Sequence, residues 1–115
     1  MNTTLIPCEP LTQVVFVHDY IQLVFQDETF NLYNQVELEY ATRLFRSGEL
    51  GFCDTLVSLI NKRVVSTSSG ATCKLELTFE GGTRLRVRPD VDSACGPDSF
   101  EYFGPQNLLV SEPNY

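Results

Sequence analysis

Few residues of this chain have side chains suited to catalysis, and they lie far apart. The single histidine, His18, is the only side chain whose ordinary pKa lies near neutrality, and it precedes Asp19 in a stretch that reads as a hairpin turn. No nucleophile motif accompanies it, so an exposed turn residue is the simpler interpretation. We therefore predict no catalytic residue, no metal site and no cofactor, and a protein that is not an enzyme. An unrecognised active site built on His18 or a cysteine is the remaining catalytic alternative.

The four cysteines are widely separated and form no C-x-x-C pair, the spacing typical of redox dithiols and zinc ribbons. They are Cys8, Cys53, Cys73 and Cys95. The amino terminus lacks the basic start and apolar stretch of a secretory signal, and no apolar run approaches the roughly 20 residues of a membrane span. We expect a cytoplasmic protein without membrane association, whose cysteines are buried or partly buried thiols that pack as small apolar residues.

Charged side chains recur at every second position in two segments. Glu37 and Glu39 form one pair, and Arg84, Arg86 and Arg88 form a row. Residues two apart on a strand share a face. The carboxylates alone could serve a hydrolase or bind a cation, and the arginines alone could bind an anion. Cross-strand pairing of the arginines with Glu37, Glu39 and Glu76 accounts for both sets at once.

The chain is acidic, with fifteen Asp and Glu residues against eight Lys and Arg, a net charge of -7 and a pI near 4.5. Such a charge disfavours nucleic acid and attracts cationic partners. Acids also gather next to aromatic residues between positions 90 and 103, which suits an interface for a basic protein, although a solvated loop is the alternative. The predicted partner-binding residues are Asp90, Asp92, Asp98, Glu101 and Tyr102, together with Glu37 and Glu39.

The sequence nearly repeats itself. Residues 21–29, IQLVFQDET, align with residues 75–83, LELTFEGGT, and a pair of valines precedes each segment. Apolar and polar residues alternate in both, which indicates strands. We predict two antiparallel three-stranded β-meanders, over residues 12–40 and 62–89, that form one curved sheet or a small sandwich. The first includes a long strand from Phe30 to Tyr40. Gly81-Gly82 suits a tight turn, whereas Asp27-Glu28 matches one poorly.

One short helix is expected between the meanders, near residues 54–61. Asp54 can cap it, and Leu56, Leu59 and Ile60 recur at helical spacing. Residues 41–51 fit either a continued strand or a helical turn, residues 90–99 read as a loop, and residues 100–110 read as a final interrupted strand or hairpin. With 43% hydrophobic residues, the 115-residue chain is predicted to be a single α+β domain over residues 1–115.

A longer pattern carries a resemblance. The segment LTFEGGTRLRVRP at residues 77–89 is followed by Phe100-Glu101-Tyr102 and by Leu108-Leu109-Val110 before Pro113. Over about residues 12–112 the chain resembles a loose group of small β-rich bacterial proteins of unknown function. Members of such groups are often immunity proteins of polymorphic toxin systems, including contact-dependent growth inhibition. The resemblance implies an immunity protein. Combined with the net charge of -7 and the lack of a catalytic set, it leads us to expect a protein that binds and occludes a basic cognate toxin, with a nuclease as the leading candidate. A small-molecule or peptide-binding β module is the alternative.

Overall fold

The computed structural model describes residues 6–69, 73–89, 98–104 and 109–113, which form two five-stranded antiparallel sheets and one short helix. In chain order the elements are β1 (Gln13–Val17), β2 (Tyr20–Phe25), β3 (Glu28–Leu32), β4 (Val36–Tyr40), β5 (Arg43–Arg46), α1 (Phe52–Val57), β6 (Val64–Ser68), β7 (Leu75–Phe79), β8 (Arg84–Val87), β9 (Asp98–Phe103) and β10 (Leu109–Pro113). The predicted class, antiparallel β with one short helix, is confirmed.

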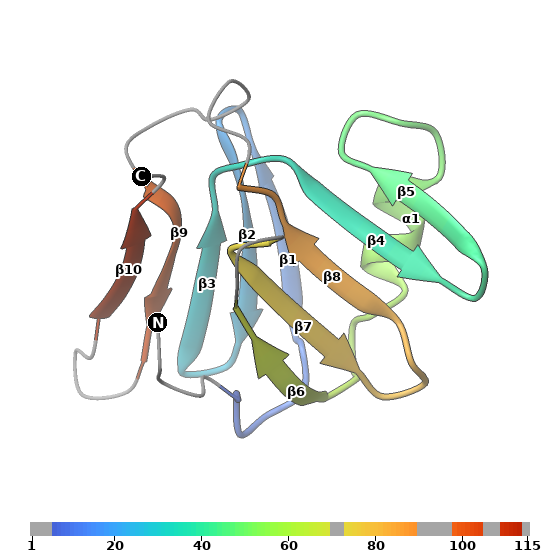
Figure 1. Ribbon diagram of the computed structural model, residues 1–115. Coiled ribbons are helices and arrows are strands. Elements are labelled where there is room, and N and C mark those ends of the chain that lie inside the picture. Colours follow the sequence, from blue (N-terminus) through green and yellow to red (C-terminus); the bar gives the residue numbers. More distant parts are fainter. Residues whose placement is uncertain (1–5, 70–72, 90–97, 105–108, 114–115) are drawn as a thin grey trace.

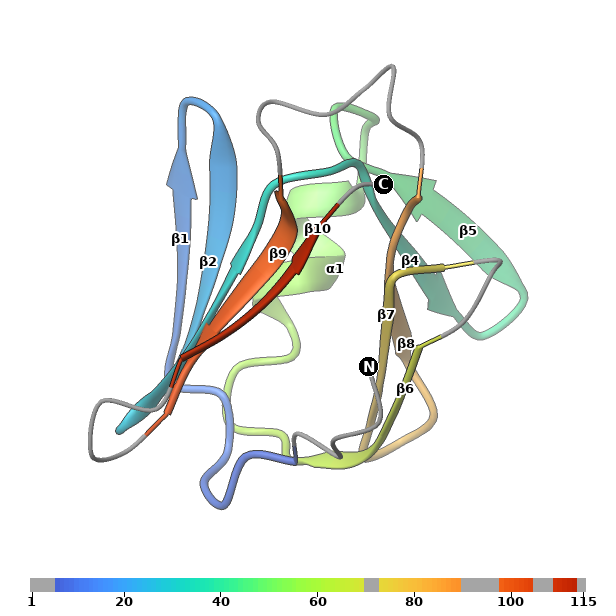
Figure 2. The same cartoon turned by 60° about the vertical axis from the view of Figure 1, so that its left-hand side comes forward.

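The two sheets face each other across the core, with α1 between them at one end (Figures 1 and 2). The first sheet has the order β1-β2-β3-β9-β10, and the second has the order β5-β4-β8-β7-β6. Two three-stranded meanders are not confirmed, because each sheet has five strands. The first sheet also combines strands from both ends of the chain, and β3 pairs directly with β9.

The predicted long strand from Phe30 to Tyr40 is wrong. β3 ends at Leu32 and β4 begins at Val36, so residues 33–35 carry the chain from the first sheet to the second. Backbone groups hold this crossover in place: the Tyr33 N–H donates to the Ser99 carbonyl at 2.9 Å, and the Arg88 N–H donates to the Gln35 carbonyl at 2.9 Å. The apolar alternation continues across the break because both strands face one shared core.

The hairpin turns follow the local sequence closely. The turn between β1 and β2 lies at His18-Asp19, as predicted. Gly81 and Gly82 have φ of 88° and 93°, the positive values that glycine adopts without steric cost. The turn before β3 is one residue earlier than expected. It lies at Gln26-Asp27, with Gln26 at φ 63°, so Glu28 is the first residue of β3.

Residues 41–51 contain the strand β5 and end at Gly51, the N-cap residue of α1. The helix begins at Phe52, after Gly51 at φ 89°, so Asp54 lies in its first turn instead of capping it. A β-carbon on Gly51 would lie 2.8 Å from the Phe45 ring, so this position combines a left-handed backbone with close packing. A helix of six residues is unstable alone. Burial of Phe52 and Leu56 in the core holds α1 in place.

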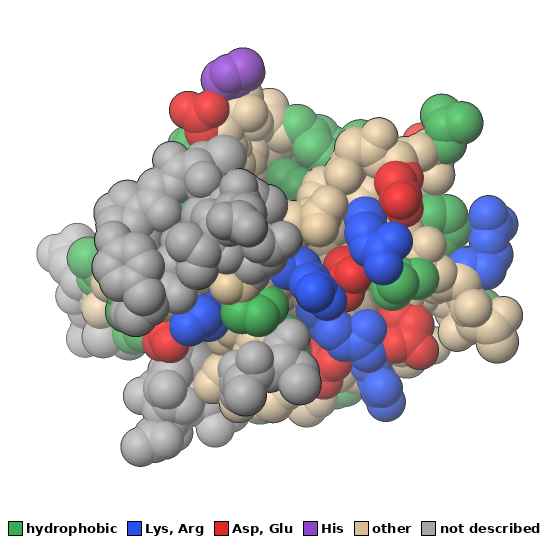
Figure 3. Space-filling view, turned by 45° about the horizontal axis from the view of Figure 1, so that its top comes forward, with side chains coloured by type: hydrophobic (Ala, Val, Ile, Leu, Met, Phe, Trp, Pro, Cys, Tyr) green, Lys and Arg blue, Asp and Glu red, His purple; other side chains and the backbone are tan. Residues whose placement is uncertain are grey.

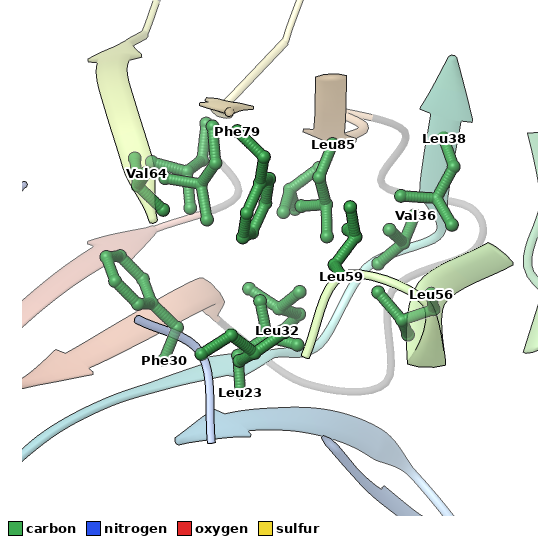
Figure 4. Packing of buried hydrophobic residues seen from close by; sticks show 14 of the residues in the cluster. Leu23, Phe30, Leu32, Val36, Leu38, Leu56, Leu59, Val64, Phe79 and Leu85 are labelled. Atoms are coloured by element: carbon green, nitrogen blue, oxygen red, sulfur yellow. The ribbon is translucent and has the colours of Figure 1, made fainter. Parts of the chain in front are cut away.

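One cluster of buried side chains joins the two sheets and the helix (Figure 4). Phe25 of the first sheet stacks on Phe79 of the second with ring centroids 6.4 Å apart, and it also meets Phe30 edge-on at 6.0 Å. Leu56 and Leu59, from and just after α1, point toward the same cluster (Figure 4). The described buried residues therefore share one core.

The cysteines differ from expectation in part. Cys73 is buried, as predicted, but Cys8 and Cys53 are exposed. Cys95 lies outside the described residues. The prediction of buried or partly buried thiols is therefore wrong for Cys8 and Cys53. Cys8 lies in an irregular segment and Cys53 on the exposed side of α1, and sequence periodicity locates neither.

Candidate partner-binding face

The outer face of the second sheet carries a row of ion pairs, and Figure 3 shows basic and acidic side chains interleaved on one face of the molecule. Arg86, at its centre, donates from Nε to Glu76 at 2.7 Å and from its guanidinium to Glu39 at 2.6 Å. Glu37 accepts from Arg46 at 3.0 Å and from Arg88 at 3.4 Å. The pairing of arginines with Glu37, Glu39 and Glu76 that the spacing predicts is present in the structure.

These pairs leave Glu37 and Glu39 poorly placed to recruit a partner. Glu37 is only 5% exposed, and the hydrogen bond from Arg86 lowers the pKa of the Glu39 carboxyl below its usual value. Glu37 is shared by two arginines and Glu39 is paired with Arg86, so little unpaired negative charge remains at either carboxylate. Both residues are therefore better explained as parts of the ion-pair row than as partner contacts.

The ion pairs also determine where the net charge of the chain resides. Ion pairs on this face join three arginines with three glutamates: Arg46, Arg86 and Arg88 with Glu37, Glu39 and Glu76. The charges of these six residues cancel. The remaining five cations and twelve acids therefore carry the whole net charge of -7. The acidic residues that can attract a cationic partner are therefore those outside the ion-pair row of the second sheet.

The outer face of the first sheet has a different composition. Because Leu23, Phe25, Phe30 and Leu32 point into the core, the residues between them point outward. We give the name tyrosine face to six of the outward side chains of β2, β3 and β9 and the turn after β3: Tyr20, Gln22, Asn31, Tyr33, Glu101 and Phe103. Glu101 is its only charged member. Phe103, at 40% exposed, lies at one end of it, next to Leu109 of β10 at 53%.

Hydrogen bonds and ring contacts fix the side chains of the tyrosine face. The Tyr33 hydroxyl donates to a Glu101 carboxylate oxygen at 2.5 Å, and the Tyr33 ring lies 5.4 Å from the Tyr20 ring. Gln22 Nε2 donates to Asn31 Oδ1 at 3.0 Å. A pre-ordered set of this kind loses little side-chain entropy when a partner binds. Uncharged polar groups, aromatic rings and few charges are the composition of protein interface cores.

The Tyr33–Glu101 pair gives this face a measurable pH signature. Burial, and then the hydrogen bond to Glu101, raise the pKa of Tyr33 from 10.0 to about 12. Between pH 10 and 12 the unfolded chain has lost this proton while the folded chain retains it, so stability falls as the pH rises through that window. We expect Tyr33→Phe to reduce the slope of unfolding free energy against pH there, as measured by urea denaturation at several pH values. An unchanged slope would contradict the assignment.

The structure separates the predicted partner-binding residues. Asp98 and Glu101 lie on β9, both half-buried, and Glu101 is on the tyrosine face. Asp90 and Asp92 fall outside the described residues. The sequence pattern did not single out Tyr20, Gln22, Asn31 and Tyr33 as a group. The available signal was a tyrosine at the first position of β2 and another immediately after β3.

Tyr102 is buried, so it is not the exposed aromatic anchor that its position next to Glu101 suggested. It is 4% exposed and lies between β3 and β10. Its hydroxyl donates to Glu28 Oε1 at 2.5 Å, and Glu28, itself 6% exposed, also accepts from the Cys8 N–H at 2.8 Å. Burial and this hydrogen bond raise the pKa of the Tyr102 hydroxyl. Adjacent strand residues face opposite sides, so Phe103 takes the outward position instead.

A groove of about 330 Å³ opens where the turn between β1 and β2 lies next to the crossover after β3. Its described lining includes Tyr20 and Tyr33, with Asp19 from the turn and Ser47 from the end of β5. His18 also lines it, but its side chain is 96% exposed and its imidazole is 3.5 Å from the Asp19 carboxylate. The groove therefore adjoins the two tyrosines of the tyrosine face.

Other kinds of site are not apparent in the described part of the chain. Residues 6–69, 73–89, 98–104 and 109–113 contain no group of three His, Cys, Asp or Glu side chains arranged to hold a metal ion. Within the same residues, α1 is far too short to cross a membrane, and no other helix is present that would do so. Comparison with protein-family models, curated proteins and solved structures finds no match to this chain.

Proposed function

We propose that this protein is a non-enzymatic binding domain that neutralises a basic protein partner in the cytoplasm, as an immunity protein neutralises its cognate toxin. The observation that carries the proposal is the division of charge. Six paired charges cancel on the second sheet, whereas the first sheet presents a pre-ordered aromatic face with one carboxylate on a molecule of net charge -7.

The two parts of this arrangement have different roles in binding. The acidic surplus accelerates encounter with a cationic protein, because complementary potentials steer association. The tyrosine face then supplies the contact area: ordered Tyr20 and Tyr33, the exposed Phe103, and a Glu101 carboxylate whose direction Tyr33 fixes. A nuclease toxin suits this surface, since its substrate groove must be cationic to bind nucleic acid.

The test is a charge reversal on the tyrosine face. The purified product of the neighbouring gene is titrated against Glu101→Lys by calorimetry, and we expect a Kd about 100-fold weaker, because the variant places a cation opposite a cationic surface. Asp54→Lys is the matched control. It makes the same change in net charge at an exposed helix position that is not part of the tyrosine face. Circular dichroism verifies that both variants are folded.

Two results would contradict the proposal. Failure of the unaltered protein to bind the neighbouring gene product would remove the partner. Equal weakening by Glu101→Lys and Asp54→Lys would show that overall charge, and not the tyrosine face, governs affinity.

The groove supports a second candidate function, the binding of a small molecule or a peptide side chain. A volume of about 330 Å³ is at the lower end of ligand sites, and two tyrosines border it. A ligand held there should raise the melting temperature of the unaltered protein and not that of Tyr20→Ala, in a thermal-shift screen of metabolites and short peptides.

A further inference from the structure

Three of the four sheet edges carry features that oppose pairing with another strand. β10 ends in Pro113 and shifts register between Glu112 and Pro113. β6 shifts register between Val64 and Ser66. β5 carries arginines at both ends. Proline, irregular register and charge are the devices by which natural sheets protect their edges.

β1, the remaining edge, has none of these features. Its sequence is QVVFV, without charge or proline, and it pairs with β2 in unbroken register over its whole length. Phe16 and Val17 are 47% and 41% exposed. Figure 2 shows β1 as the outermost strand of the first sheet. Alternate N–H and C=O groups of an edge strand point away from its neighbour, so β1 presents a regular, apolar pairing surface.

We propose that β1 pairs antiparallel with β1 of a second copy of this chain, so that two first sheets join into one continuous sheet. The strand complements itself about Val15. In that register Val15 lies opposite Val15, Val14 opposite Phe16, and Gln13 opposite Val17. Pairs of β-branched and aromatic residues are the ones that stabilise antiparallel ladders. The half-exposed Phe16 and Val17 would be covered on opposite faces of the joined sheet.

Pairing with a second copy brings no charged side chains together across the joined strands, because β1 carries none. Within the paired segment, Gln13 to Val17, no like charges meet directly. Only the long-range repulsion between two molecules of net charge -7 opposes the pairing, and salt screens it beyond about 8–10 Å. Self-association should therefore strengthen with salt, whereas binding of a basic partner should weaken.

The test is sedimentation equilibrium of the full chain over a range of protein concentrations, at low and high salt. We expect a monomer–dimer equilibrium whose Kd falls as salt rises. Val15→Lys should raise that Kd at least about tenfold, because two ammonium groups then meet on the two-fold axis. Val65→Lys is the matched control: it makes the same substitution at the 56% exposed Val65 of another edge strand, β6, and should leave the Kd unchanged.

Amide hydrogen exchange of the unaltered protein tests the pairing of β1 without any substitution. Protection of the β1 amides should increase with protein concentration, whereas protection of the β6 amides should not. A monomer at all concentrations and salts, equal weakening by the two lysine variants, or β1 amides that exchange independently of concentration would each overturn the proposal. None of these measurements depends on the toxin partner, so the outcome is separate from that of the proposed function.

Discussion

Phe25→Ala is expected to lower the free energy of unfolding by about 3–5 kcal/mol, the range for deleting a fully buried phenylalanine ring. Phe25 is 0% exposed and stacks on Phe79 across the gap between the sheets, while also meeting Phe30 within its own sheet. Its removal leaves a cavity between the two sheets. Urea denaturation monitored by circular dichroism measures the loss.

Val24→Ala is the control for this prediction. Val24 is the neighbouring residue of β2, faces outward and is half-buried, so its truncation should cost well under half as much. A loss from Phe25→Ala of less than about 1 kcal/mol would mean that the sheets do not pack as described, because no well-packed ring of this size is lost so cheaply.

Tyr102→Phe is expected to cost about 1.5–3 kcal/mol, the range for a hydrogen bond to a charged group. The substitution keeps the ring in the core and removes only the hydroxyl that donates to Glu28. The carboxylate, 6% exposed, would then keep the Cys8 N–H as its remaining described donor. The cost arises from leaving a buried carboxylate short of a partner. Thermal and urea unfolding give the same quantity independently.

A double-mutant cycle identifies the source of this cost. In a Glu28→Gln background the acceptor is neutral, so Tyr102→Phe should cost less than it does beside the carboxylate. Tyr40→Phe removes the same hydroxyl from a side chain that is 50% exposed, and it should change stability by less than about 0.5 kcal/mol. Equal costs for Tyr102→Phe in both backgrounds would show that Glu28 is not the relevant partner.

Local sequence predicts most of the strands but not the sheet to which each belongs. Alternation correctly indicates β2, β3, β4 and β7, and the Gly81-Gly82 pair correctly indicates its turn. The same alternation concealed the break at residues 33–35. A strand that crosses between two sheets around one core keeps its inward and outward pattern, so period-two patterning carries no mark of the crossover.

In the candidate site too, contacts that follow from local spacing were predicted, and contacts that depend on long-range strand pairing were not. The pairing of Arg86 with Glu39 and Glu76 follows from two-residue spacing, which places charges on common faces. The meeting of Tyr33 with Glu101 does not, because the residues are 68 positions apart and depend on the pairing of β3 with β9. Tyr102 was misjudged for a related reason: which face of β9 is buried depends on β3 and β10.

The pairing of β3 with β9 has a consequence for how the polypeptide is made. The second sheet is built from residues 36–87, a continuous stretch that is complete before β9 and β10 are synthesised. The first sheet must wait, because β3 lacks its neighbour until residues 98–103 have left the ribosome. During that interval β1, β2 and β3 form a sheet without β9 and β10. The nascent protein thus passes through a stage at which both edges of its three-stranded amino-terminal sheet, β1 and β3, are unpaired.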